Sequence, residues 1–313
     1  MTTAQSCGSF MDFPVGMIQS YNSAWNEARN AAMNPTVAVV AQGAMGAGIG
    51  GRLAERGLRV VTSLSGRSEA SAKRAVAAGM VAVSDQECAQ ADYFLSILPP
   101  NEALALAEKM AALIGPSNKK PIYVDCNAVS PPTKVRIGAV AAKAGSPFVD
   151  VSILGLPPRA GYDGPAMIVS GPDAGQFVPL GDFGLKIRVI DGPIGAASAV
   201  KMSYAGITKG ITALGSMIML AATRAGVAAE VRSELERSHP YFVTNFQRAV
   251  PDMFDKAYRF VGEMEEIADF VGEDKSAAQM YLAFADFYRR IAADVAGGHD
   301  ETDKLSAFLK PKA

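Results

Sequence analysis

A glycine turn placed directly after a short apolar segment constrains the fold more than any other feature of this sequence. Residues 37–41 (VAVVA) run into residues 42–46 (QGAMG), and residues 47–56 follow with the composition of a helix. The order is strand, tight turn and helix. A helix that starts on such a turn points its unpaired N–H groups and the positive end of its dipole toward the turn, where they attract an anion. The segment predicts a phosphate-binding turn within a βαβ unit.

The region after this turn alternates between short apolar runs rich in Val and Ile and Ala-rich stretches. The runs expected to form strands are 36–41, 58–64, 92–98, 121–125, 147–151, 166–170 and 186–190. The segments expected to form helices lie around 45–56, 68–78, 101–114 and 131–145. This alternation is typical of a parallel sheet flanked by helices. The fold class is therefore α/β, with an N-terminal Rossmann-type doubly wound sheet.

After Ile190 the pattern changes from strands to helices. Residues 195–226 have high helix propensity, and residues 210–222 are apolar on every face, as in a buried helix. The uncharged stretch between Lys209 and Arg224 has about fourteen residues, fewer than the ~20 that span a bilayer. We therefore expect a long interdomain helix rather than a membrane span, leading into an all-α C-terminal domain.

The chain is accordingly expected to have three parts. These are an N-terminal extension (1–33), a dinucleotide-binding Rossmann domain (34–192) and an all-helical domain for substrate binding and dimerisation (193–313). Residues 1–32 lack the apolar core of a secretory signal, and Met33 lies just before the first strand. We expect removal of residues 1–32 to leave folding and activity intact.

Charge and composition limit the classes of partner. Thirty Lys and Arg residues against thirty-one Asp and Glu residues give a formal net charge of -1, without the basic excess that nucleic-acid or anionic-membrane binding needs. We expect a small-molecule substrate. Three scattered cysteines and two histidines offer neither a disulfide framework nor a metal site, and the odd cysteine count fits a reducing compartment. The expected location is the cytoplasm.

The glycine turn matches most of a GxGxxG dinucleotide fingerprint. Gly43 and Gly46 supply its second and third glycines, and Ala41 replaces the first. Ala44 and Met45 lie between the two glycines, where the backbone would approach a pyrophosphate. We therefore assign residues 43–46 to cofactor binding.

The end of the second predicted strand indicates which dinucleotide is bound. An NAD site usually has an acidic residue here for the ribose 2′-hydroxyl, whereas this chain has residues 63–68 (SLSGRS). Arg67, with the hydroxyls of Ser65 and Ser68, can bind a 2′-phosphate through charge-assisted hydrogen bonds. This favours NADP over NAD. The alternative is that Arg67 and Ser68 only open and cap the next helix.

Five segments, taken in order, resemble the β-hydroxyacid dehydrogenases, the family that includes 6-phosphogluconate and 3-hydroxyisobutyrate dehydrogenases. They are residues 41–57 (AQGAMGAGIGGRLAERG), 96–99 (SILP), 123–131 (YVDCNAVSP), 150–171, and 192–195 (GPIG) followed by Lys201. The resemblance covers roughly residues 34–226. It implies an NAD(P)-dependent oxidoreductase, with Leu98 and Pro99 beside the nicotinamide ribose, Asn127 and Gly155 in the substrate loops, and Lys201 as the catalytic lysine.

The sequence departs from this family at the substrate. The family usually has Ser-Gly-Gly in the sixth-strand loop, where this chain has Leu154-Gly155-Leu156. It has Asn residues three and four positions after the lysine, where this chain has Tyr204 and Ala205. We expect Tyr204, which shares the helix face of Lys201, to donate a hydrogen bond to the substrate oxygen in place of the asparagine. In the same region Arg159 can clamp a substrate carboxylate, although a solvated loop arginine is the simpler interpretation.

Residues 252–268 resemble a C-terminal domain of unknown function found in 6-phosphogluconate dehydrogenase-like proteins. Apolar residues recur there at spacings of three and four, which predicts an amphipathic helix. Glu263, Glu265 and Glu266 are expected to form its solvated face.

Together these features predict an NADP-dependent oxidoreductase that interconverts an alcohol and a carbonyl, with Lys201 as general acid and base. An imine reductase of the same architecture is a close alternative, although such relatives usually replace the lysine. A non-catalytic NADP-binding sensor is the alternative from another class. We also expect a homodimer, because the apolar interdomain helix has more apolar surface than its own few neighbours can cover.

Overall fold

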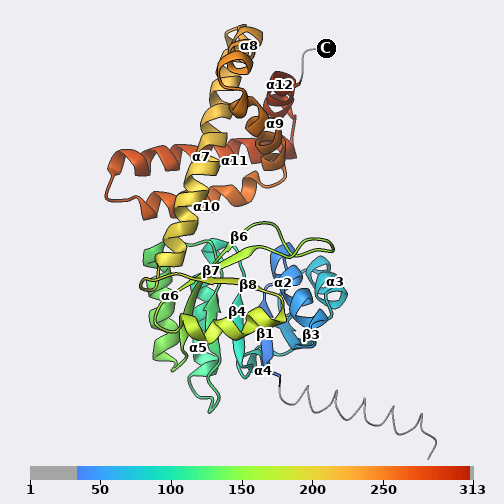
Figure 1. Cartoon of the computed structure of the whole chain (residues 1–313), viewed down its shortest axis with the longest axis vertical. Helices are drawn as coiled ribbons and strands as arrows, with labels where there is room; N and C mark the ends of the chain where they lie inside the picture. The colour runs from blue at the N-terminus through green and yellow to red at the C-terminus, as the bar shows by residue number, and fades with distance from the viewer. Residues whose placement is uncertain (1–33, 311–313) are drawn as a thin grey trace, which may run out of the picture.

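The computed structural model describes residues 34–310, and the predicted N-terminal extension lies outside them. Figure 1 shows an α/β part with an all-helical part standing on it, joined by one long helix. The strands are β1 (Thr36–Val40), β2 (Arg59–Ser63), β3 (Val81–Val83), β4 (Tyr93–Ser96), β5 (Ile122–Asp125), β6 (Phe148–Leu154), β7 (Ala166–Ser170) and β8 (Lys186–Val189). The helices among them are α2 (Ala44–Glu55), α3 (Glu69–Ala77), α4 (Asp85–Cys88), η1 (Pro100–Glu102), α5 (Ala103–Ile114), α6 (Pro131–Lys143) and η2 (Ala174–Phe183).

The eight strands form one sheet in the order β3-β2-β1-β4-β5-β6-β7-β8. All neighbours are parallel except β6 and β7, which pair antiparallel. The predicted α/β class and doubly wound sheet are confirmed. The strand order reverses at β1: β2 and β3 are added on one side of it, and β4 and the later strands on the other. The turns after β1 and β4 therefore flank the crevice where open α/β sheets bind ligands.

Two apolar layers cover the sheet because successive strand residues point to opposite faces. Val37 and Val39 of β1 pack with Ile49 and Leu53 of α2 in one core. Residues of the opposite parity, such as Ala38, pack with α4, α5 and α6 in a second core. This explains the uninterrupted apolar runs of the sequence, since strands buried on both faces have no polar alternation.

Strand β3 and helix η2 were missed by the sequence analysis. Strand β3 has three residues at the sheet edge, and Val81 and Ala82 are exposed, so no apolar run marks it. Helix η2 contains Pro179 and is a 3-10 helix, which has no 3.6-residue period to recognise. The other predicted strands agree with the structure to within a few residues.

The C-terminal part is helical throughout its described residues, as predicted. It contains α7 (Ala196–Arg224), α8 (Ala228–Ser238), α9 (Pro240–Phe254), α10 (Ala257–Phe270), α11 (Lys275–Ala296) and α12 (Asp300–Leu309). Helices α10 and α11 form a hairpin that extends to one side of α7 (Figure 1). A third core is built from α7, α9, α10, α11 and α12. The predicted division at residues 192 and 193 stays a prediction.

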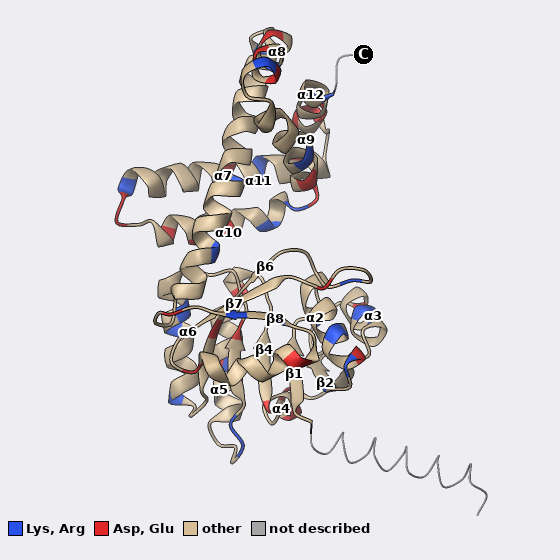
Figure 2. Cartoon of the chain, viewed as in Figure 1, with Lys and Arg blue, Asp and Glu red and all other residues tan. Residues whose placement is uncertain are grey.

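Helix α7 is long and apolar enough to span a membrane by length and composition, and half of its most apolar stretch is buried inside the protein. Its packing against four other helices is that of a core helix. However, it is not buried on every face as expected. Five large residues form an exposed apolar stripe along α7: Tyr204, Ile207, Ile211, Leu214 and Ile218. Basic and acidic residues are interspersed over both parts of the molecule (Figure 2).

Candidate active site

The glycine turn leaves room for an anion in front of α2. Gly43 is the N-cap residue of α2, and no side chain caps the helix. A Cβ atom added at Gly43 would meet nothing within 4 Å, whereas one at Gly46 would lie 1.8 Å from the carbonyl oxygen of Ala41. Gly46 is therefore required for packing of the helix on the strand, and Gly43 faces open space. Ala44 and Met45 form the first turn, whose N–H groups suit a pyrophosphate.

Arg67 and the two serines lie where the second strand ends, next to this turn. Ser68 is the N-cap residue of α3 and its hydroxyl accepts a hydrogen bond from the backbone of Ser71. The guanidinium of Arg67 lies 3.7 Å from Glu102, and Ser65 is exposed. Ser68 therefore caps α3. The Arg67 side chain takes no part in this capping and is partly exposed beside the N-terminus of α3.

The structure adds Arg74, which the sequence analysis missed. Its Nε donates to the carbonyl oxygen of Gln42 across 2.8 Å, and its Nη2 donates to Ser71. This guanidinium therefore links α3 to the glycine turn. Arg74 lies six positions after the N-cap residue Ser68, and nothing in this spacing indicates a contact with the glycine turn. The fold of α3 brings the Arg74 side chain back to that turn.

Asn127 ties together the loops after β4 and β5. Its side-chain oxygen accepts a hydrogen bond from the backbone N–H of Leu98. Its amide nitrogen donates to Ser96 across 2.8 Å and to Asp125 across 2.7 Å. Asn127 is buried, Leu98 is nearly so, and Pro99 is exposed. Both amide hydrogens of Asn127 are thus used by the protein, so a substrate can only bond to its oxygen.

Lys201 lies in the second turn of α7, and its Nζ donates to the carbonyl oxygen of Ile153 in β6 across 3.1 Å. Burial lowers the pKa of Lys201 from 10.5 to about 8. The positive charges of Lys209 and Lys134 contribute to this lowering of the pKa, and the negative charge of Glu263 partly opposes it. A lysine with this pKa exchanges a proton near physiological pH.

Helix α10 brings acidic residues to the same place. Glu263 forms an ion pair with Lys209 of α7, and the ammonium of Lys209 lies 4.2 Å from the centre of the Phe260 ring. The Glu263 side chain is only 17% exposed, and its pKa is lowered because Lys209 and Lys201 lie nearby. The prediction that Glu263 lies on a solvated helix face is therefore wrong. A sequence shows helix periodicity but not which helix packs on which.

The same helix also docks on the α/β part. The Glu266 carboxylate accepts a hydrogen bond from the backbone N–H of Ser130 across 2.6 Å. The Asp269 carboxylate accepts one from the Ser130 hydroxyl across 2.6 Å. Ser130 is the N-cap residue of α6, so both carboxylates lie at the positive end of a helix dipole. Of the three glutamates, Glu265 alone is exposed as predicted.

The remaining predicted substrate residues lie at the surface. Tyr204 follows Lys201 by one turn and is 59% exposed. Gly155 has φ +130, and an added Cβ would lie 2.9 Å from the Tyr162 hydroxyl, so this position requires glycine. Arg159 is exposed in the loop between β6 and β7. The structure does not bring Arg159 into contact with Lys201, and its contact with substrate stays a prediction.

The described residues contain no group of His, Cys, Asp and Glu that could hold a metal ion. Cys126 is buried, and burial raises the pKa of its thiol, which keeps it protonated and unreactive.

Comparison with known proteins identifies the family. Residues 36–177 match the model of the NAD binding domain of 6-phosphogluconate dehydrogenase, and residues 222–291 match a domain of unknown function, DUF1932. An uncharacterised 28.5 kDa protein of Methanothermus fervidus is 31% identical over 217 residues, which are 68% of this chain and 82% of that protein. The chain belongs to the 6-phosphogluconate dehydrogenase-like family of NAD-binding proteins. The predicted resemblance, including the C-terminal domain, is confirmed.

Solved structures share the family fold. The conserved protein MTH1747 of unknown function, described as similar to 3-hydroxyacid dehydrogenases, has 29% identity and a TM-score of 0.61 over 82% of this chain and 99% of its own. Mycobacterium tuberculosis 3-hydroxyisobutyrate dehydrogenase has 19% identity and a TM-score of 0.64, over 88% and 98%. An imine reductase from Myxococcus stipitatus in complex with NADP+ has 19% identity and a TM-score of 0.53, over 88% and 100%. The last two show the fold alone.

The glycine turn of this family member fits the cofactor that the family name implies. The open space at Gly43 and the uncapped start of α2 accommodate a pyrophosphate, and Leu98 and Pro99 follow the neighbouring strand of the crevice. The chain therefore has an NAD(P)-binding domain, and membership indicates an oxidoreductase.

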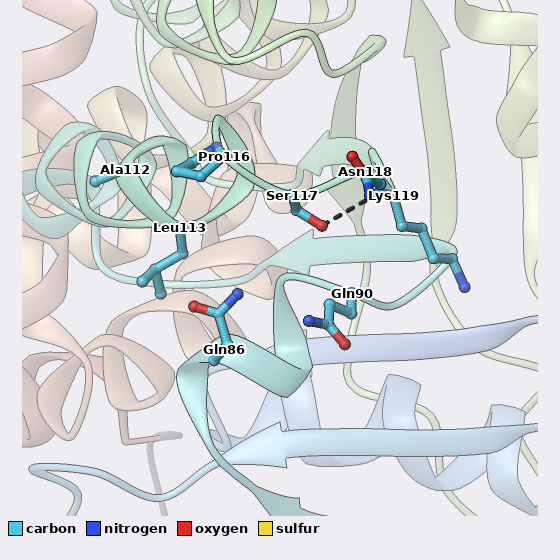
Figure 3. Close-up of a pocket in the computed structure, with 8 residues that line it drawn as sticks. All are labelled: Gln86, Gln90, Ala112, Leu113, Pro116, Ser117, Asn118 and Lys119. Atoms are coloured by element: carbon cyan, nitrogen blue, oxygen red, sulfur yellow. Dashed lines mark hydrogen bonds between the residues drawn. The ribbon is translucent and has the colours of Figure 1, made fainter.

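A separate cavity of about 400 Å³ lies outside this site. It is lined by residues of α4, α5 and the loop before β5, among them Gln86, Gln90 and Lys119 (Figure 3). These residues precede β4 and β5, at the amino ends of the strands. Ligands of open α/β sheets bind at the carboxyl ends, so we assign no role to this cavity.

Proposed function

We propose that this protein is an NADP-dependent oxidoreductase that transfers a hydride between nicotinamide and the carbon of an alcohol or carbonyl group, with Lys201 as general acid and base. The observation that carries the proposal is the environment of Lys201. Its ammonium is partly buried at the end of β6, beside the loop that Asn127 organises, and has a pKa of about 8. A solvated surface lysine would have neither feature.

The chemistry of Lys201 follows from this pKa. Oxidation of an alcohol requires its hydroxyl proton to leave, and the neutral amine of Lys201 accepts it. Reduction of a carbonyl requires a proton at oxygen, and the ammonium form donates it. The cofactor supplies the hydride carrier. The hydrogen bond to Ile153 holds Nζ in one position, so the side chain does not have to change its conformation before proton transfer.

The support for NADP as the cofactor is the positive charge near the end of β2 and the glycine turn, which would attract a 2′-phosphate. Arg67 precedes α3, Arg74 reaches back from the last turn of α3 to the carbonyl oxygen of Gln42, and Ser65 and Ser68 add hydroxyl groups. No acidic residue occurs between Ser63 and Ser68 to bind a free ribose hydroxyl. Glu102, which pairs loosely with Arg67, would be displaced when the phosphate binds.

The proposed substrate is a small molecule that is larger and less polar than a short hydroxy acid. Leu154 and Leu156 flank Gly155 in the loop after β6, and Leu156 is 52% exposed. Tyr204 offers a hydroxyl one turn after Lys201, and Asn127 and Arg159 provide the remaining polar groups. The apolar loop, together with the donors of Tyr204 and Arg159, favours a substrate that is largely apolar and carries one carbonyl or hydroxyl group.

The proposed assembly is a homodimer that covers the apolar stripe of α7. Ile207, Ile211, Leu214 and Ile218 recur at spacings of four, three and four, which is the seam of a helix that pairs with another helix. An exposed seam of this length is unusual on a monomer. The buried free thiols of Cys88 and Cys126 are consistent with the proposed cytoplasmic location.

A substrate panel tests this function. Oxidation of NADPH is followed with aldehydes, ketones, keto acids and imines, with NADH in parallel. We expect turnover with a carbonyl compound. Turnover restricted to imines would identify an imine reductase, the alternative that shares the fold. NADPH binding without turnover of any member would favour a sensor instead.

A further inference from the structure

The side chain of Lys134 is completely buried in the α/β part, although a lysine is almost never fully buried unless it is paired. It lies in the first turns of α6 and has 0% exposure. Its ammonium forms an ion pair with Asp125 and lies 3.4 Å from the Asp150 carboxylate. It also donates to the carbonyl oxygens of Asp125, across 2.7 Å, and Val151, across 3.2 Å. One cation thus joins the carboxyl end of β5 to the middle of β6.

Asp125 connects this cation to the loop beside the cofactor crevice. One carboxylate oxygen of Asp125 accepts the Asn127 side-chain amide across 2.7 Å, and the other accepts the Asn127 backbone N–H across 3.2 Å. Asn127 in turn accepts the backbone N–H of Leu98. The orientation of the Asn127 loop therefore depends on a carboxylate that Lys134 holds.

Asp150 connects the same cation to the helix that carries Lys201. The Asp150 carboxylate accepts the backbone N–H of Gly195 across 2.8 Å and that of Ser198 across 3.4 Å. Gly195 is the N-cap residue of α7 and has no side chain to cap the helix, so Asp150 does this from β6. The Ser170 hydroxyl donates to the same oxygen and accepts the N–H of Ala197. The start of α7 is fixed by this carboxylate.

We propose that Lys134 is a positioning residue of the active site, which sets the Asn127 loop and the start of α7 relative to each other by holding Asp125 and Asp150 with a single buried cation. This inference rests on the proposed function of Lys201. A lysine suits the role because its hydrogen bonds go to Asp125 and to the carbonyl oxygen of Val151, while its charge lies 3.4 Å from Asp150. This single charge offsets the repulsion between the two carboxylates in a dry interior.

Lys134 also acts on Lys201 through its charge. The charged and titratable groups that face Lys201 are Glu263 of α10, Lys209 of α7, Lys134 of α6 and the Cys126 thiol after β5. Lys134 is one of the two cations that lower the pKa of Lys201. Removing its charge therefore raises the pH at which Lys201 loses its proton, which a purely structural lysine elsewhere would not do.

The test compares Lys134→Met with Lys143→Met. Methionine is similar in length and apolar, so it fills the buried space, and Lys143 is an exposed lysine of the same helix. We measure kcat per molecule that binds NADPH, the dissociation constant of NADPH and the melting temperature. We also measure the pH midpoint for acylation of Lys201 by an amine-selective reagent, located by peptide mapping in the cofactor-free protein, which requires no activity.

The expected result for Lys134→Met is a kcat about 10- to 100-fold below that of the wild type, since misplacement by about 1 Å has this effect. NADPH affinity should change less than threefold, and the midpoint for Lys201 should move to higher pH. Lys143→Met should match the wild type in every measurement. A kcat of Lys134→Met within twofold of wild type, with an unchanged midpoint, would overturn the proposal even if the melting temperature fell.

A second variant tests the proposal if Lys134→Met does not fold. The double substitution Lys134→Met, Asp150→Asn removes one of the two carboxylates that lose their cation, which leaves Asp125 without a like charge opposite it, and keeps an oxygen that accepts the Gly195 N–H. It should fold and still show the loss in kcat, and wild-type kcat in this variant would refute the positioning role. If Lys201→Ala retained full activity, the proposed function would fail, but the acylation midpoint would still report whether Lys134 acts on Lys201.

Discussion

The Nζ atom of Lys201 is held 3.1 Å from the carbonyl oxygen of Ile153, so the lysine of α7 is anchored to the end of strand β6. This contact joins the helical part of the molecule to the carboxyl edge of the sheet. Because that edge is also where the glycine turn and the Asn127 loop lie, the contact places an ionisable amine beside the cofactor crevice.

Substitution of Lys201 tests its proposed role directly. We expect Lys201→Ala to lower kcat by ~10²–10⁴-fold, the usual range for loss of a general acid and base. The dissociation constant of NADPH should change little, because the glycine turn and Arg67 are untouched. Steady-state kinetics and NADPH fluorescence titration measure the two quantities. Near wild-type kcat would contradict the assignment and direct attention to Tyr204.

The pH dependence of the two reaction directions should be opposite. With a pKa of about 8, Lys201 is mostly protonated at neutral pH. Carbonyl reduction needs the ammonium form, so its rate should fall as pH rises through about 8, and alcohol oxidation should increase over the same range. Glu263 raises this pKa, so Glu263→Gln should move both midpoints to lower pH. The exposed Glu265→Gln is the control, and equal shifts in both variants would refute the assignment.

The two glycines of the turn should respond differently to alanine. Gly46→Ala places a Cβ 1.8 Å from the Ala41 carbonyl oxygen and should destabilise the fold by ~3 kcal/mol or more. Gly43→Ala meets no protein atom within 4 Å and should keep the wild-type melting temperature. It should nevertheless weaken NADPH binding, because the methyl group occupies the space of the pyrophosphate. Unchanged NADPH affinity in Gly43→Ala would argue against cofactor binding at this turn.

Arg67 and Arg74 should determine the preference for NADP. Loss of one charge-assisted hydrogen bond is worth about 1.5–3 kcal/mol, so Arg67→Ala or Arg74→Ala should weaken NADPH binding roughly 10- to 100-fold. NADH binding should be unaffected in Arg67→Ala, whereas Arg74→Ala also removes the hydrogen bond to Gln42 and should weaken NADH binding to a smaller extent. Lys73→Ala, at an exposed lysine of the same helix, should bind NADPH as the wild type does. Parallel titrations with NADPH and NADH measure the two dissociation constants. An equal loss of affinity for both cofactors would show that these arginines do not bind the 2′-phosphate.

Charge placed in the α7 stripe should separate the proposed dimer. The double variant Ile211→Glu, Ile218→Glu puts carboxylates in the seam, and its mass by light scattering should be that of the 32.7 kDa monomer. Val76→Glu changes a more exposed apolar residue on α3 and should leave the dimer intact. A wild-type protein that is already monomeric at working concentration would exclude the proposal.

Most of the strands and helices, in their order, and the location of the phosphate-binding turn could be predicted from the sequence. These are local properties: β1 is apolar throughout because both its faces are buried, and the glycines at 43 and 46 must follow it directly. The periodicity also located α10. Helix η2 was not predicted because it has no 3.6-residue period, and strand β3 was not predicted because it has only three residues.

Which distant side chains come into contact depends on how the helices and strands pack. Glu263 and Glu266 had the spacing of a solvated helix face, yet α10 packs them against Lys209 and Ser130. Lys134 is a charged residue, yet it is fully buried because two carboxylates from separate strands lie beside it. Local sequence fixes the direction of a side chain on its own helix, whereas its burial depends on the surface that the rest of the chain places against that helix.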